Sequence, residues 1–451
     1  MPGLPVERIG GALDPLKILA ISSWAPPTVG GPQFLYNLFS RFRADSYTIL
    51  TSASLIDHRS GTEGNWLPGK YVFYDRKGGW TGKATGTEGP GTGTSIPQRM
   101  AGILAKVPLV GQPSLEILGL SRAVAGFVVS AFRIIRSSKC NVILGFSDWG
   151  PALLGMYIVH RITGVPYAVY YFDLYGGNLL SPVQRLVARH FEPRLLERTS
   201  AVILTNEGTE RYLRRRFGDG HRYEVVPNSV LPESYGPLLT PFDPKPPYEI
   251  LYTGQAYWPQ EGALLNMIHA MDRLRDIPVR FHLHIPIVPE SIRQAVRGRP
   301  NVHLTSEIVP LSEMPRMQCN ASLLFLPLSW NTKAPDIIAT ASPGKLSEYL
   351  ASGRPMLVHG PEDSFVARFT REHGTGIVVD RDDVEVLAGA VRRFCQEPAA
   401  CREGVERALR IFAQRHDARR NAAKLWGILT EIGGRERAPS GNPEEREGPP
   451  R

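Results

Sequence analysis

The sequence predicts an α/β protein of two doubly wound, Rossmann-like domains that face each other across a cleft. Short apolar runs alternate with amphipathic stretches of helical length in both halves of the chain, which is typical of parallel sheets covered by helices. A proline-rich segment, 228–247, separates the two halves and predicts an interdomain linker. At 451 residues the chain is too long for one ordinary core, so more than one domain is expected.

The first half, residues 1–232, is predicted to form the N-terminal domain. It is interrupted by residues 54–112, whose Gly, Thr and Pro content predicts an irregular insert, most mobile over 78–95. The apolar stretch 117–135 that follows predicts a helix, which either packs on the sheet or lies as an amphipathic helix on a membrane. Strands are expected at 17–22, 47–50, 141–144, 166–171, 201–204 and 223–226.

The second half, residues 233–432, repeats the alternation and predicts the C-terminal domain. The polar tail 433–451 is rich in Pro and Gly and is expected to be disordered. Ligands of open α/β sheets bind beyond the carboxyl ends of the strands, so the cleft between the domains is the expected ligand site. Strands are expected at 249–252, 279–284, 302–305, 321–325, 355–358 and 376–379.

The charge balance points to an anionic partner. The formal net charge is +9 and the isoelectric point about 9.4, which suits a nucleotide, a phosphate, a nucleic acid or an acidic membrane surface. Nucleic acid is the least favoured of these, because the basic residues are scattered and form no stripe interleaved with aromatic side chains.

Three features of the sequence predict a cytoplasmic protein. The four cysteines have neither metal-binding nor redox spacing, so buried thiols in a reducing compartment are expected. The first residues contain no apolar segment flanked by basic residues, so no secretory signal is expected. No stretch of about 18 uncharged apolar residues occurs, so we expect no membrane span and at most peripheral contact with the inner face of a membrane.

The segment 342–355, SPGKLSEYLASGRP, predicts a short helix with functional residues at its start. Ser342 is the expected N-cap, and Pro343 suits the first helical position. Lys345 and Glu348 fall on the polar side of this helix. One interpretation is a solvated ion pair between the two, and the other is an anion site at the helix N-terminus.

Two motifs of the first half fall at the ends of predicted strands. In PPTVGG, the adjacent Gly30 and Gly31 form either an ordinary tight turn or a loop whose backbone N–H groups approach a ligand closely. Asp173 ends the apolar run 169–172, where it either caps the next turn or lines the cleft as an acid–base group. Ser147 and Asp148 end the preceding strand and also face the expected cleft.

Together with the strand ends 225–228 and 251–254, these motifs resemble a GT-B glycosyltransferase of the family 4 type. The resemblance extends from the first strand to about Trp426 and is weakest over 54–112. It implies an N-terminal acceptor-binding domain and a C-terminal domain that binds a nucleotide sugar. The implied reaction is the transfer of a hexosyl group, with retained configuration, from a nucleotide-diphosphate sugar to a glycan, a lipid-linked sugar or another hydroxyl acceptor.

The resemblance also implies roles for single residues. Glu348 would accept hydrogen bonds from the ribose hydroxyls, and Lys345 would lie near the diphosphate. Asp173 would be the catalytic residue that orients the acceptor hydroxyl or takes its proton, with Ser147 and Asp148 on the acceptor side. The implied donor-binding set is Gly30, Gly31, Gly254, Gln255, Thr340, Pro343, Gly344, Lys345, Leu346 and Glu348.

The chain departs from the family pattern at three donor-side positions. Thr340 stands where the family has a second glutamate, with Asp336 as a candidate substitute. Gln255 and Gln260 stand where the family has an arginine and a lysine that steady the leaving diphosphate. Lys345, Arg354 or Lys333 are the candidates to compensate. These departures keep open an alternative function, that of a catalytically impaired GT-B protein that binds a nucleotide or a partner.

No metal or cofactor is expected. His282 and His284 lie on one side of a predicted strand, but no third ligand accompanies them in the sequence. The family resemblance likewise implies a reaction without metal, in which the nucleotide sugar is a co-substrate. The expected partners are therefore the nucleotide sugar, a hydroxyl acceptor and a membrane surface, with no nucleic acid.

Overall fold

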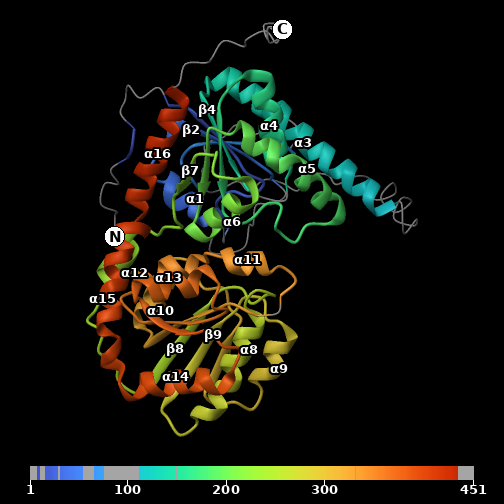
Figure 1. Cartoon of the computed structure of the whole chain (residues 1–451). Coiled ribbons are helices and arrows are strands. Elements are labelled where there is room, and N and C mark those ends of the chain that lie inside the picture. Colours follow the sequence, from blue (N-terminus) through green and yellow to red (C-terminus); the bar gives the residue numbers. More distant parts are fainter. Residues whose placement is uncertain are drawn as a thin grey trace, which may run out of the picture.

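A computed structural model describes residues 8–10, 16–28, 31–53, 66–75, 111–147, 150–330 and 332–434. Figure 1 shows two bodies, each built on one sheet. Every strand in both sheets pairs in parallel with its neighbours, and each sheet separates two hydrophobic cores. This arrangement confirms the predicted class of two Rossmann-like domains.

The N-terminal sheet has seven strands in the order β3-β2-β1-β4-β5-β6-β7, so the winding reverses between β1 and β4. Alternate residues of β1 enter opposite cores, Ile18 and Ala20 on one face and Leu19 and Ile21 on the other. Burial of both faces explains why this strand is apolar throughout. The strands are β1 Ile18–Ile21, β2 Tyr47–Thr51, β3 Lys70–Phe73, β4 Val142–Phe146, β5 Tyr167–Tyr171, β6 Ala201–Leu204 and β7 Tyr223–Val225.

Strand β3 corrects the prediction of an irregular insert over 54–112. Residues 70–73 pair in parallel with β2 and form the edge of the sheet, with Tyr71 fully buried. This strand was not predicted because it has only four residues and its flanks are rich in glycine and proline. The remainder of the insert up to residue 110, including 78–95, lies outside the described residues, apart from 66–69 and 74–75.

Helices of the N-terminal domain follow the strands as predicted. Helix α3 is longer than expected, and its second half packs on β1 and β2 through Phe127, Ala131 and Ile134. Its first half extends away from the domain (Figure 1). The helices are α1 Gly31–Phe39, α3 Gly111–Ser138, α4 Pro151–Thr163, α5 Pro182–Arg198 and α6 Glu207–Phe217.

The C-terminal sheet has six strands in the order β10-β9-β8-β11-β12-β13. All six were predicted to within two residues at each end. The strands are β8 Tyr248–Thr253, β9 Val279–His284, β10 Val302–Thr305, β11 Leu323–Pro327, β12 Met356–His359 and β13 Gly376–Val379. The helices are α7 Pro232–Tyr235, α8 Glu261–Ala270, α9 Glu290–Val296, α10 Met314–Asn320, α11 Pro335–Thr340, α12 Gly344–Ala351, α13 Phe365–His373, α14 Val384–Gln396 and α15 Arg402–Ile411.

The chain crosses between the domains twice, and the second crossing leads into α16 (Ala418–Gly434). The two crossings are joined where Val230 N donates to the His416 carbonyl and Ala418 N donates to the Val230 carbonyl, both at 3.1 Å. Helix α16 then packs beside α1, with Leu429 and Ile432 fully buried in the N-terminal core (Figure 1).

The expected assignment of 233–432 to one domain is therefore wrong for α16. The apolar stripe of α16 covers a face of the N-terminal sheet that α1 alone leaves open. The order of elements in the sequence did not indicate that the chain returns to the N-terminal domain. Residues 433 and 434, expected in the tail, complete the helix, whereas 435–451 lie outside the described residues.

Candidate active site

The start of α12 forms one wall of the candidate site. Its N-cap is Pro343 rather than the predicted Ser342, and no side chain caps it. The Ser342 carbonyl instead accepts a hydrogen bond from Asn228 Nδ2 at 2.7 Å, across the first domain crossing. No described residue accepts from the backbone N–H groups of Gly344 and Lys345, so these donors remain available to an anion.

Lys345 lies over β8 at the same end of the helix. Its Nζ is 5.1 Å from the centre of the Tyr252 ring, and a Cβ on Gly254 would lie 2.7 Å from it. Gly254 has φ +121°, a conformation that favours glycine, and its missing side chain leaves room for the lysine. Burial lowers the pKa of Lys345, with Glu348 acting weakly in the opposite direction.

No ion pair joins Lys345 to Glu348 among the described residues, so the interpretation as a solvated ion pair is wrong. Glu348 instead accepts a hydrogen bond from Gln318 Nε2 at 2.8 Å, and Gln318 Oε1 accepts one from the Tyr235 hydroxyl at 2.7 Å. This chain of bonds fixes the half-buried carboxylate beside the helix N-terminus. The sequence gave no signal for Gln318, which lies on α10, thirty residues before Glu348.

The end of α11 serves the contact between the domains. The Thr340 carbonyl accepts from Asn206 Nδ2 at 2.9 Å, and its hydroxyl donates to the Asp336 carbonyl within the helix at 2.7 Å. Asn206 is the N-cap of α6, and its place before a helical stretch was enough to predict that role. Its hydrogen bond to Thr340 could not be predicted from the sequence. Leu346 is buried in the C-terminal core, so only its backbone can face a ligand.

The facing wall comes from the first turn of α1. Gly31 begins this helix and is exposed, whereas Gly30 and Asp148 lie outside the described residues. The Phe34 ring approaches α12 so closely that a Cβ on Gly344 would lie 2.3 Å from it. The N-terminal turns of α1 and α12 therefore meet, one from each domain, as the sequence motifs implied.

Asp173 follows β5 on the N-terminal side of the cleft. Ser147 Oγ donates to the Asp173 carbonyl at 2.9 Å and accepts from Phe172 N at 3.1 Å, so Ser147 holds this turn. No described residue donates to the Asp173 carboxylate, and the backbone N–H groups beyond it are not capped by this side chain. The capping alternative is therefore not supported.

The Asp173 side chain is exposed, and partial loss of surrounding water raises the pKa of its carboxyl from the ordinary value. Its charge in turn contributes to the raised pKa of Tyr257, although burial of that phenol is the larger cause. Tyr257 follows β8 in the C-terminal domain, so the two side chains face each other across the cleft.

The candidates for compensating charge differ in position. Arg354 donates to the Thr240 carbonyl at 3.0 Å and to its hydroxyl at 2.6 Å, so it secures the linker and is not available to a ligand. Lys333 is exposed. Gln255 is exposed, and Gln260 is the buried N-cap of α8, whose side-chain oxygen has no hydrogen-bond partner. Lys345 is therefore the cation placed at the start of α12.

Two family models match the chain. A glycosyl transferase 4-like domain matches residues 84–229, and a glycosyl transferases group 1 domain matches residues 247–397. These matches correspond to the N-terminal and C-terminal bodies, respectively. No curated protein sequence matches the chain.

Several solved structures share the fold. A glycosyltransferase from Rickettsia africae ESF-5 is 11% identical, with 92% of this chain and 98% of that chain covered at a TM-score of 0.62. Sucrose-phosphate synthase from Thermosynechococcus elongatus is 14% identical, with 93% and 99% covered at 0.61. Anabaena HepE, solved in complex with UDP and glucose, is 13% identical, with 92% and 100% covered at 0.60.

The contact between α1 and α12 can be tested with Gly344→Ala. The added methyl group would overlap the Phe34 ring, and overpacking of this kind costs about 1–3 kcal/mol. Phe34→Leu should remove most of that cost, as measured by urea unfolding of the single and double variants. Gly427→Ala, at an exposed helical glycine with no atoms near its Cβ, is the control and should not destabilise. An equal cost of Gly344→Ala in both backgrounds would show that the helices do not touch.

Proposed function

Because the chain belongs to the GT-B glycosyltransferases, with a 4-like domain followed by a group 1 domain, we propose that it transfers a hexosyl group from a nucleoside-diphosphate sugar to a hydroxyl acceptor. The observation that carries this proposal is the uncapped start of α12, which meets the first turn of α1 at Gly344 and carries Lys345 and Glu348. HepE has been solved with UDP and with UDP-glucose, which makes a uridine nucleotide the first donor to test.

The donor diphosphate would bind at the N-terminus of α12. The free N–H groups of Gly344 and Lys345 and the helix dipole favour negative charge there, and the Lys345 ammonium has no carboxylate partner to displace. The leaving diphosphate gains charge during transfer, so this fixed positive end stabilises it without reorganisation. Glu348, held by Gln318, is placed to accept two hydrogen bonds from a ribose diol.

The acceptor hydroxyl would meet Asp173 on the facing wall. A carboxylate with no donor among the described residues can accept a hydrogen bond from an incoming hydroxyl, and Ser147 fixes the turn that presents it. We propose retention of configuration on the basis of the motif resemblance. We also propose a reaction without metal. The described residues contain no group of three His, Cys, Asp or Glu side chains that could hold an ion, and Lys345 is placed to meet the diphosphate charge.

We further propose peripheral attachment to the cytoplasmic face of an anionic membrane through α3, α4 and α5. These helices contact one another, and the described cysteines are all free thiols, as in a reducing compartment. Large apolar side chains are exposed on these helices at Ile117, Leu118, Val129, Ile158, Ile162 and Leu186. Exposed arginines accompany them at 122, 133, 136, 161, 185 and 189.

Surface attachment fits this region better than a span. By length and composition Ser114–Ser138 could cross a membrane, although no span was expected from the sequence. Phe127, Ala131 and Ile134 are nevertheless committed to the domain core, so only the outer side of α3 is free to enter a lipid surface. The arginines of the neighbouring helices would bind anionic headgroups.

Glu348→Ala tests the donor site. Loss of the ribose contacts should weaken UDP binding about tenfold or more in calorimetry, since hydrogen bonds to charged groups are worth about 1.5–3 kcal/mol. Glu290→Gln, an exposed change on α9, should leave UDP affinity unaltered. Unchanged affinity in Glu348→Ala would show the donor assignment to be wrong. Donor binding without any transfer would favour the alternative of an impaired, nucleotide-binding protein.

Titration of Asp173 should produce the acidic limb of the profile of turnover against pH. Its raised pKa means that the active carboxylate is lost as the pH falls through a value above 3.8, so turnover should rise with pH across that value. Hydrolysis of the nucleotide sugar, with water as the acceptor, provides the measurement. Asp173→Asn should abolish turnover at every pH, whereas Asp45→Asn, at an exposed aspartate paired with Arg43, should not change it. A limb retained in Asp173→Asn would assign it to another group.

Membrane attachment can be measured by sedimentation with vesicles. The protein should bind phosphatidylcholine vesicles that contain phosphatidylglycerol, with binding reduced by salt. The double change Ile117→Glu and Leu118→Glu should reduce this binding strongly, whereas Ile308→Glu, at an exposed isoleucine of the C-terminal domain, should not. Binding that is equal for both variants would contradict this attachment face.

A further inference from the structure

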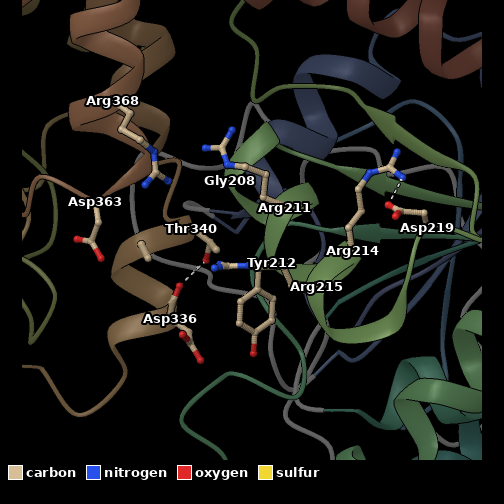
Figure 2. Close-up of a pocket in the computed structure, with 11 residues that line it drawn as sticks. Gly208, Arg211, Tyr212, Arg214, Arg215, Asp219, Asp336, Thr340, Asp363 and Arg368 are labelled. Carbon is tan, nitrogen blue, oxygen red and sulfur yellow. Dashed lines mark hydrogen bonds and ion pairs between the residues drawn. The ribbon is translucent and has the colours of Figure 1, made fainter.

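A cavity of about 560 Å³ lies beside the candidate active site, between α6 of the N-terminal domain and α11 and α13 of the C-terminal domain. Figure 2 shows that its walls carry arginines from both domains, Arg211, Arg214 and Arg215 from α6 and Arg368 from α13. Neither Lys345 nor Glu348 lines this cavity, but Thr340 of the implied donor-binding set does, so the cavity adjoins the proposed donor site.

Three of these arginines have no carboxylate partner among the described residues. Arg211, Arg215 and Arg368 form no ion pair there, and the buried Nε of Arg368 has no hydrogen-bond partner. Burial and the charges of Arg211 and Arg215 lower the pKa of Arg368, an effect that the carboxylates of residues 363 and 372 only partly oppose. Arg214 differs, because it donates to Glu210 at 2.9 Å and to Asp219 at 3.0 Å.

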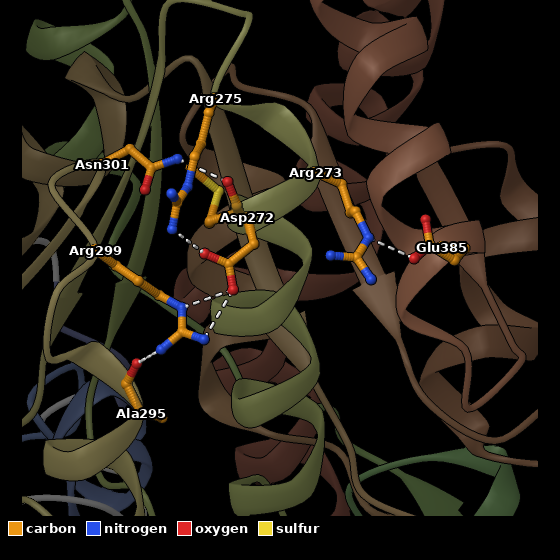
Figure 3. A network of polar contacts seen from close by, with 8 residues as sticks. Asp272, Arg273, Arg275, Ala295, Arg299, Asn301 and Glu385 are labelled. Carbon is orange, nitrogen blue, oxygen red and sulfur yellow. Dashed lines mark hydrogen bonds and ion pairs between the residues drawn. The ribbon is translucent and has the colours of Figure 1, made fainter.

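One partly buried arginine elsewhere in the protein, Arg299, has a carboxylate partner. In the network of Figure 3, Arg299 donates to Asp272 Oδ2 at 3.0 and 2.8 Å, and Arg273 donates to Glu385. Arg299 is comparable to Arg368 in being partly buried, yet two of its nitrogens donate to one carboxylate oxygen of Asp272. The cavity therefore concentrates positive charge that the protein itself does not neutralise, which is the electrostatic setting for a bound anion.

One wall of the cavity lies near the loop that follows Asp173, the proposed acceptor-side residue. Thr340, at the end of α11, lines it. Its opposite wall includes Tyr212, whose hydroxyl would lie 3.1 Å from a Cβ on Gly177, in the loop that follows Asp173. Asp336 also lines the cavity near Tyr212 and contributes to the raised pKa of that phenol, for which burial is the main cause.

We propose that this cavity binds the phosphoryl group of a phosphorylated acceptor. The proposal rests on the proposed function and names the chemical class of its acceptor, a hydroxyl compound that carries a phosphate. Guanidinium groups from two helices can contact several phosphoryl oxygens at once. A ligand with a single carboxylate has only two oxygens and would leave some of these donors unused. Asp336 and Tyr212 then lie where hydroxyl groups of the same molecule can hydrogen-bond to them.

The test compares a hexose phosphate with its parts, by calorimetry on the full chain in the presence of saturating UDP. The probes are glucose 6-phosphate, glucose and inorganic phosphate. UDP occupies the proposed donor site, so binding of the probes reports on the second site. Arg368→Gln and Arg211→Gln are compared with Arg410→Gln, which removes an exposed arginine on α15 that does not line this cavity.

We expect glucose 6-phosphate to bind more tightly than either glucose or inorganic phosphate. Arg368→Gln and Arg211→Gln should each weaken glucose 6-phosphate binding about tenfold, as expected for loss of a charge-assisted hydrogen bond. Arg410→Gln should bind glucose 6-phosphate as the wild type does, and all three variants should keep the wild-type affinity for UDP. The ligand-free Arg368→Gln protein should melt no lower than the wild type, because the change removes an unpaired charge that Arg211 and Arg215 repel.

Three results would overturn the proposal. An equal loss of glucose 6-phosphate affinity in Arg368→Gln and Arg410→Gln would exclude a specific anion site. Inorganic phosphate binding as tightly as glucose 6-phosphate would assign the cavity to free phosphate instead of an acceptor. A lower melting temperature for Arg368→Gln would assign the arginine to the fold. A wild-type protein that binds glucose 6-phosphate but not UDP would support the cavity and overturn the proposed donor site, so the two failures can be told apart.

Discussion

Two asparagine amides of the N-terminal domain determine where the start of α12 points. Asn206 and Asn228 donate to the Thr340 and Ser342 carbonyls, on either side of the turn that leads into this helix. Each bond satisfies a backbone acceptor at the domain boundary, and together they hold the turn from two strand ends of the facing sheet. The free N–H groups of α12 consequently meet the first turn of α1, and the arrangement of the donor site depends on this contact.

The protein concentrates unpaired positive charge at the cleft and compensates it elsewhere. Lys345 has a lowered pKa and no carboxylate partner among the described residues, and Arg368 is in the same condition beside the second cavity. Arg299, in contrast, is paired with the Asp272 carboxylate of its own domain. Unpaired and partly desolvated cations reduce the stability of the free protein, and an anionic ligand would recover that free energy on binding.

The three departures from the family pattern have different structural consequences. Thr340 contacts the N-terminal domain through its backbone carbonyl, so this contact does not depend on the identity of its side chain. Gln260 is buried as the N-cap of α8, whereas Gln255 is exposed just after β8, the strand over which Lys345 lies. The loss of two cations near Gly254 leaves Lys345 and the α12 dipole to carry the electrostatic stabilisation of a leaving diphosphate. In the proposed reaction, turnover would therefore depend on Lys345 to an unusual degree.

The sequence alone determined the fold class, most strand positions and the helix that begins at Gly344, because these follow from local apolar periodicity and from glycine and proline at the ends of elements. It also placed Ser147 and Asp173 after neighbouring parallel strands, whose carboxyl ends share one edge of the sheet, and Lys345 and Glu348 on one helix, while their roles remain predictions. Only the tertiary structure decided the return of α16 to the N-terminal core, the link from Gln318 to Glu348 and the cluster of Arg211, Arg215 and Arg368. These are contacts between residues far apart in the chain, and no local pattern encodes which distant partner a buried side chain will meet.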